Sequence, residues 1–143
     1  MTLTIYYLYL FFLSLTGWFL SFYFLGVVSN KIKSNSWWIP SFCRMNENSC
    51  SSLVLTKYGN IFGHPNAFWG MIYYSIIILF IFLAILSIKI SYIFFIFSLL
   101  AFLLSIYLIF GLFKLKVNCP ICITNHIIIF LMIFLTSHFN FIK

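Results

Sequence analysis

The chain has 143 residues, of which 64% are hydrophobic and only 6% are charged. A soluble domain carries roughly 25% charged residues, so this composition excludes an ordinary water-soluble domain. The length and composition together indicate one compact domain in lipid. Eight Lys and Arg oppose a single acid, Glu47, for a net charge of +7; they stand singly between apolar runs, so lipid headgroups account for them better than nucleic acid does. One carboxylate also excludes paired-carboxylate hydrolysis and carboxylate-clustered metal sites.

Four uncharged apolar runs are long enough to cross the roughly 30 Å hydrocarbon core of a bilayer. They cover about residues 4–28, 66–88, 91–113 and 119–139. Backbone groups in lipid must be bonded internally, so each run is expected to be helical. The first run has neither a basic leading segment nor a cleavage-site pattern, which favours an anchor over a removed signal peptide. We therefore predict a single all-α transmembrane domain over residues 1–143, folded as a four-helix bundle.

The connections between these runs differ in length. The second and third runs are joined by little more than Lys89 and Ile90, and the third and fourth by "KLKVN", so neighbouring helices should be antiparallel. The connection from 29 to 65 is long and holds most of the polar residues. With four spans, this loop and the start of the fourth helix fall on the same side of the membrane. All four cysteines then share one face: Cys43, Cys50, Cys119 and Cys122.

Three interpretations of the four cysteines compete. Small apolar fillers are common uses of free Cys, but none of the four lies in the middle of a span. A structural zinc site needs four tetrahedral ligands, yet the spacing of Cys43 and Cys50 is wide for a zinc knuckle. Two redox pairs are the third interpretation. Cys119-Pro-Ile-Cys122 has the spacing of dithiol–disulfide exchange and opens a helix, whose N-terminus stabilises a thiolate. Pro120 suits the first helical turn. The loop pair, Cys43 and Cys50, can deliver electrons to the helix pair through a mixed disulfide.

The electrons need an acceptor. The sequence has no haem-type Cys-x-x-Cys-His and no Rossmann glycine pattern, whereas a lipid-soluble quinone would reach Cys122 from within the bilayer. His126 lies four residues after Cys122, on the same helical face, and is a candidate to hydrogen-bond a quinone carbonyl or relay a proton. The alternative is a satisfied polar residue between helices. Ionisable residues inside a membrane are costly, which favours the functional interpretation.

From Cys43 onward, the sequence resembles the vitamin K epoxide reductase family. The resemblance is carried by Cys43 and Cys50, by "TKYGNIFGHPNAFWGMIYY" and by "CPICITNH". In the DsbB family, the other four-helix thiol–quinone enzymes, the Cys-x-x-Cys pair follows the first helix and the wider pair comes later. Here the wide pair comes first and Cys-x-x-Cys opens the fourth helix, which is the vitamin K epoxide reductase order.

The resemblance implies a role for each matching residue. Cys43 would be the outer shuttle thiol, Cys50 would hand electrons to Cys119, and Cys122 would attack the quinone. Three further residues would belong to the quinone site. Asn66 would hydrogen-bond a quinone oxygen, and His126, which stands where animal members have a Tyr, would serve the same purpose. Thr56 would lie near the active cysteines. Many bacterial members carry a fused thioredoxin-like domain, and this chain ends at Lys143, so a separate thioredoxin-like or DsbA-like partner is expected.

Asn66 also has a simpler explanation, because an Asn after Pro65 is a reasonable helix N-cap. Gly59 and Gly63 are most simply turn residues at the entry to the second helix.

The expected function is transfer of two electrons between protein dithiols and ubiquinone, menaquinone or vitamin K (or its epoxide), in support of disulfide-bond formation and without a metal. The long extracytoplasmic loop would cap the quinone site. The chemistry requires the cysteines to face the periplasm or the ER lumen, so the location would be a bacterial inner membrane or the ER membrane. The alternative is a non-catalytic membrane protein with a structural disulfide or a zinc site made of four cysteines.

The distribution of charge opposes this orientation. Six basic residues would lie on the cysteine side, and only Lys89 and Lys143 on the cytoplasmic side, whereas the positive-inside rule favours the reverse. The cysteine chemistry is the more specific signal, so we retain the orientation that it requires. The six residues are Lys31, Lys33, Arg44, Lys57, Lys114 and Lys116.

Overall fold

The computed structural model describes residues 2–33, 35, 37–39, 41, 55–86, 91–117 and 119–142. In that part of the chain, four helices are long and apolar enough to cross a membrane. They are α1 (Leu3–Val28), α3 (Asn66–Ile85), α4 (Ser91–Leu115) and α5 (Pro120–Ile142). A short hairpin of β1 (Asn60–Ile61) and β2 (His64–Pro65) precedes α3. The predicted all-α bundle of four membrane-length helices is confirmed.

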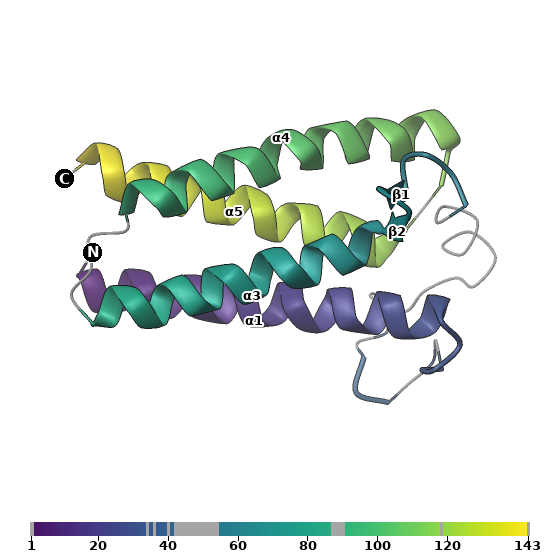
Figure 1. The fold of residues 1–143 in the computed structure, drawn as a ribbon, viewed down its shortest axis with the longest axis horizontal. Helices are drawn as coiled ribbons and strands as arrows, with labels where there is room; N and C mark the ends of the chain where they lie inside the picture. Colours follow the sequence, from purple (N-terminus) through teal and green to yellow (C-terminus); the bar gives the residue numbers. More distant parts are fainter. Residues whose placement is uncertain are drawn as a thin grey trace.

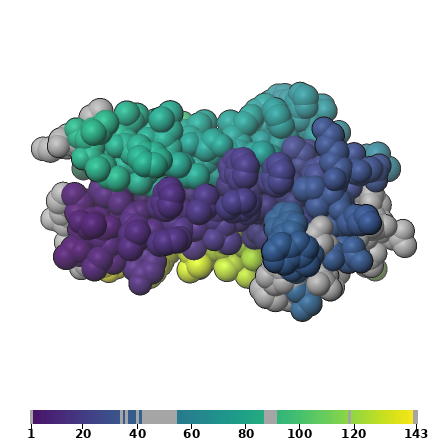
Figure 2. All heavy atoms as spheres, turned by 90° about the horizontal axis from the view of Figure 1, so that it is seen from below, coloured from purple at the N-terminus to yellow at the C-terminus, as the bar shows by residue number. Residues whose placement is uncertain are grey.

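The four helices pack as two pairs (Figure 1). α1 packs along α3, and α4 packs along α5, while α5 also contacts α1. Figure 2 shows α1 and α3 lying side by side along one face of the molecule. α3 and α4 are consecutive and antiparallel, yet they hardly touch each other directly. Side chains from both line a cavity instead.

Each helix buries one side and exposes apolar residues on the other, as expected for a bundle surrounded by lipid. The buried positions of α1 recur every three or four residues, which is the helical period. They include Tyr6, Leu10, Ser14, Gly17 and Ser21. The opposite side of the same helix exposes large apolar side chains such as those of Leu8, Phe12 and Phe19.

Gly17 allows α1 and α3 to approach closely. A Cβ at this position would overlap the ring of Tyr74, so only glycine leaves room for that ring in the core. Beside this contact, the indole Nε1 of Trp18 donates to Ser75 Oγ at 3.2 Å. Tyr74 is fully buried and is thereby held between α1 and α5.

The segment before α3 folds onto the bundle. Phe62 and Gly63 have φ of 52° and 80°, the two left-handed positions of a type I′ hairpin turn. Trp69 Nε1 donates to Ile61 O at 2.8 Å, which fastens the hairpin to α3. Tyr58 is buried against Gly111 of α4. Of the expected capping loop, residues 55–65 therefore lie across the ends of α3 and α4, while 42–54 lie outside the described residues.

Both chain termini lie at one end of the bundle, and the hairpin and the start of α5 lie at the other (Figure 1). We call the second end the cysteine end. The C-termini of α1 and α4 are also there, so the described basic residues gather at this end. These are Lys31, Lys33, Lys57, Lys114 and Lys116.

Candidate functional site

The described cysteine pair sits at the first turn of α5. Cys119 and Cys122 form a disulfide, with their Cα atoms 5.3 Å apart. The carbonyl of Cys119 accepts the first helical hydrogen bond, from Ile123 N–H at 3.0 Å, and Pro120 takes the first helical position, where a missing N–H costs nothing. Cys119 is fully buried, while Cys122 is partly accessible. One residue of the pair is thus partly accessible and the other is fully buried.

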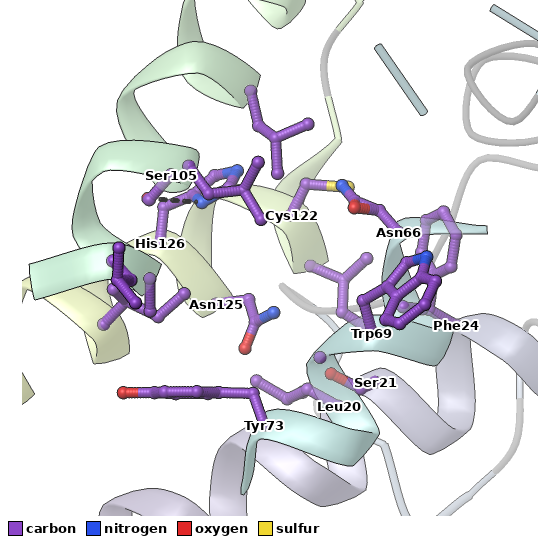
Figure 3. A pocket seen from close by; sticks show the side chains of 18 of the residues that line it. Leu20, Ser21, Phe24, Asn66, Trp69, Tyr73, Ser105, Cys122, Asn125 and His126 are labelled. Atoms are coloured by element: carbon purple, nitrogen blue, oxygen red, sulfur yellow. Dashed lines mark hydrogen bonds between the residues drawn. The ribbon is translucent and has the colours of Figure 1, made fainter. Parts of the chain in front are cut away.

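Cys122 lines a cavity of about 310 Å³ inside the bundle, at the small end of the size range of ligand pockets. All four helices contribute to the wall of this cavity, which is mostly apolar (Figure 3). The polar or reactive side chains in the wall are few: Ser21, Asn66, Trp69, Tyr73, Ser105, Cys122, Asn125 and His126. Such a site suits a flat apolar ligand that carries a small number of hydrogen-bonding groups.

Asn66 lines the cavity beside Cys122 (Figure 3). Its backbone N–H donates to Gly59 O at 3.0 Å, which ties the start of α3 to the preceding turn. Pro65 occupies the N-cap position, and Asn66 is the first helical residue. The capping explanation of Asn66 is therefore wrong, and its side chain stands in the cavity wall.

His126 lies in the same wall, one turn below Cys122 on α5. Its Nδ1 is 2.7 Å from Ser105 Oγ of α4 (Figure 3), and the imidazole is only 7% exposed. A second cavity, between α4 and α5, has a volume of about 610 Å³ and also includes Ser105 and His126. This hydrogen-bonded pair therefore separates the two cavities.

Thr56 is placed differently from the other predicted residues. Its Oγ1 accepts from Gly59 N–H at 3.3 Å, and its carbonyl accepts from the same N–H at 3.2 Å, as in a Ser/Thr turn. It is not among the residues that line either cavity. Thr56 shapes the turn that carries Gly59, and Gly59 in turn bonds Asn66.

The two remaining predicted cysteines, Cys43 and Cys50, lie outside the described residues. Among the residues that are described, no group of three or more His, Cys, Asp or Glu side chains is placed to hold a metal ion.

Five polar residues of the wall were not predicted from the sequence: Ser21, Trp69, Tyr73, Ser105 and Asn125. Asn125 of α5 accepts a hydrogen bond at Oδ1 from Tyr74 OH at 2.7 Å, and Ser21 of α1 faces the cavity from the opposite side. The spacing of Asn125 offered a signal, since it follows Cys122 by three residues and so shares its helical face. Ser21 offered none, because it is one of several serines in apolar runs.

Comparison with known proteins assigns this architecture to a family. The model of the vitamin K epoxide reductase family matches residues 8–137, nearly the whole chain. No curated protein and no solved structure gives a significant match. The match includes α3 and α4 in full, most of α1 and α5, the cysteine pair and the residues that line the cavity. The chain belongs to the vitamin K epoxide reductase family of membrane thiol oxidoreductases.

Proposed function

We propose that this protein passes two electrons from a soluble thioredoxin-like dithiol to a membrane quinone, first through Cys43 and Cys50 and then through Cys119 and Cys122. The cysteine end would face the periplasm or the ER lumen. In a bacterium the partner would be a DsbA-like protein and the acceptor ubiquinone or menaquinone. In a eukaryote the acceptor would be vitamin K quinone or its epoxide. The same cysteines serve in either case.

The observation that carries the proposal is the position of the disulfide relative to the cavity. Cys122 lies in the wall of an apolar cavity among membrane helices, whereas Cys119 is fully buried. A quinone dissolved in the bilayer can therefore reach Cys122. A soluble dithiol cannot directly reach a fully buried sulfur, which favours delivery to Cys119 by thiols of the chain itself.

The proposed reaction balances with the two thiols as the source of electrons and protons. The Cys122 thiolate attacks the quinone ring, and the Cys119 thiolate then attacks the Cys122 sulfur. The sulfur–quinone bond breaks, the Cys119–Cys122 disulfide forms, and the quinone leaves as hydroquinone with two protons. Cys50 would then attack Cys119, and Cys43 would resolve that mixed disulfide. The disulfide seen at the start of α5 corresponds to the state awaiting electrons.

The direct test is quinone reduction by purified single variants. Cys122→Ser should abolish turnover, and Cys119→Ser should accumulate a quinone adduct on Cys122, detected by absorbance and by mass spectrometry of the alkylated protein. Cys43→Ala should spare reduction driven by a small dithiol and block reduction driven by a protein dithiol. Wild-type turnover in both the Cys122→Ser and the Cys119→Ser proteins would refute the mechanism.

The competing function is a non-catalytic membrane protein stabilised by a disulfide or by zinc. A zinc site made of the four cysteines would need Cys119 and Cys122 as thiolates, whereas these two are disulfide-bonded. The same variants decide the matter, since a structural disulfide predicts no thiol-dependent absorbance change when quinone is added.

A further inference from the structure

The second cavity, between α4 and α5, is confined to the half of the bundle next to the cysteine end. Its wall begins at Phe102 and Phe130, near the middles of the two helices, and reaches Lys116 just beyond α4. The rings of Phe102 and Phe130 lie 6.1 Å apart between centroids and close the inner end. Phe102 and Lys116 are 14 residues apart, which is about 21 Å along a helix. One leaflet with its headgroups is about 20–22 Å thick, so the cavity extends from mid-membrane to the membrane surface.

The wall of this cavity is apolar and open to the surrounding lipid. On α4, Ile106, Ile109 and Phe113 recur at the helical period, and Ile123 and Ile127 do the same on α5. Four of these five side chains are also exposed, Ile109 being half-buried. A volume of about 610 Å³, drawn out over the depth of one leaflet, suits an extended hydrocarbon chain better than a compact ligand.

Lys116, at the outer end of the cavity, ends α4 in an unusual way. Its N–H donates to Phe113 O at 3.3 Å, and Val117 N–H donates to Leu112 O at 3.2 Å; together these bonds form a Schellman motif. The left-handed residue of this motif is usually Gly and sometimes Asn. α1 follows that preference with Asn30, at φ 58°, whereas α4 has Lys116 at φ 54°. A lysine destabilises this turn relative to glycine, so the turn itself does not explain its presence.

The ammonium group of Lys116 calls for an anion. It is the one charged group among the described residues that line the cavity, and it is exposed. The chain has a single acidic residue, Glu47, which lies outside the described residues. Lys57 and Lys114 add to the positive charge at the same end of the bundle. Anionic headgroups are the counter-charge that a membrane surface offers to such a cluster.

We propose that this cavity binds an anionic phospholipid such as phosphatidylglycerol. One acyl chain lies between α4 and α5, and the phosphate lies at the Lys116 ammonium group. The Ser105–His126 hydrogen bond, which separates the two cavities, lies beside the acyl chain. The site uses none of the cysteines and goes beyond the proposed electron transfer. A zwitterionic lipid of the same chain length fits the apolar wall equally well but has no net charge for the lysines, so it binds less tightly.

The test is a competition between two lipids for the full-length protein. The protein is purified in a neutral detergent and given equal amounts of dioleoyl-phosphatidylglycerol and dioleoyl-phosphatidylcholine, and native mass spectrometry measures the lipid retained. The wild-type protein should prefer phosphatidylglycerol. Lys116→Gln should reduce this preference about 5-fold. Ile106→Trp, which puts a large side chain into the apolar wall, should reduce retention of both lipids.

Two matched controls distinguish this site from general surface effects. Lys31 follows Asn30 in the motif that ends α1, is exposed and does not line the cavity. Lys31→Gln should leave the preference within about 2-fold of the wild-type value, because distant exposed charges are screened. Ile96 is as exposed as Ile106 on the same helix, 54% against 49%, but lines neither cavity. Ile96→Trp should leave lipid retention unchanged.

A glycine variant separates lipid binding from folding. Lys116→Gly should raise the melting temperature in lipid-free detergent by about 2–4 °C, because glycine adopts the left-handed conformation without strain. The same variant should lose the preference for phosphatidylglycerol as Lys116→Gln does. A protein that is more stable and yet less selective cannot owe its loss of binding to misfolding.

Two results would refute the site. Equal retention of the two lipids by the wild-type protein would mean that any lipid fills the cavity, and equal effects of Lys116→Gln and Lys31→Gln would mean that only the overall surface charge matters. Cys122→Ser should keep the wild-type lipid preference. The outcome is therefore independent of whether the proposed electron route is correct.

Discussion

The amide of Asn66 stands at the entrance of α3, where it shares the cavity wall with Cys122 (Figure 3). Pro65 precedes it and has the N-cap position without a side-chain hydrogen bond. The position of Asn66 is therefore set by backbone contacts, through its N–H to Gly59 O. Its side chain lines the cavity.

Replacing this side chain should alter ligand binding more than folding. We expect Asn66→Leu to raise the dissociation constant for quinone about 2- to 10-fold, because one neutral hydrogen bond contributes about 0.5–1.5 kcal/mol. The melting temperature should change little, since no cap is lost. Fluorescence titration and thermal unfolding in detergent measure the two quantities. Asn60→Leu, at an exposed position of β1, is the control; equal affinity of the two variants would remove Asn66 from the site.

Residues of the cavity differ in how much the sequence revealed. Cys122, Asn66 and His126 were predicted to share a site, and all three line one cavity. The first two depended on the cysteine spacing and the family resemblance, and His126 on helical periodicity. Asn125 and Ser21 were missed because their place in the cavity wall depends on how α1, α3 and α5 pack around Gly70. The sequence alone does not specify how these three helices pack.

At the level of elements, the contact between the loop and α4 depends on Gly111. A Cβ there would come within 2.5 Å of ring atoms of Tyr58 and 2.7 Å of its Cβ. Tyr58 is 7% exposed and also packs against Tyr107, with ring centroids 5.3 Å apart. This packing fixes segment 55–65 on α4, and that segment carries the hairpin leading to α3.

Adding one methyl group at Gly111 should therefore loosen the segment. Gly111→Ala should lower the free energy of unfolding by about 1–3 kcal/mol, the usual cost of overpacking, and speed proteolysis between residues 55 and 59. In the Gly111→Ala protein, adding Tyr58→Ala should lower the free energy of unfolding by less than Tyr58→Ala does in the wild-type protein, because it also removes the clash. Urea or thermal unfolding in detergent provides the measurement. Strictly additive effects would mean that the two residues do not couple.

The helices were largely predictable, and the loop was not. Apolar runs of membrane length fix where helices lie, since backbone groups in lipid have no other partners. The expected second run reached residue 88, whereas α3 ends at Ile85, and α5 continues to Ile142, beyond the expected end at 139. From the sequence, the hairpin was predicted only as turn residues. One of its two left-handed positions is Phe62, and residues with a Cβ rarely adopt a left-handed conformation.

On the scale of the whole molecule, charge and chemistry favour opposite orientations. The five described lysines of the cysteine end lie with the disulfide, and the positive-inside rule would put that end in the cytoplasm. A reducing cytoplasm, however, would keep Cys119 and Cys122 as thiols. The proposed relay delivers electrons from an extracytoplasmic partner, so we expect the cysteine end to face the oxidising compartment.

Accessibility of introduced cysteines settles the orientation. In a variant with the four native cysteines replaced by Ser, Phe62→Cys should react with a membrane-impermeant maleimide in intact bacterial cells, because the hairpin tip is 88% exposed. Thr2→Cys, at the opposite end of the bundle and also exposed, should react only after permeabilisation. The reverse pattern would place the disulfide in the cytoplasm. The orientation would then follow the positive-inside rule, and the thiol partner would have to be a protein of the reducing compartment.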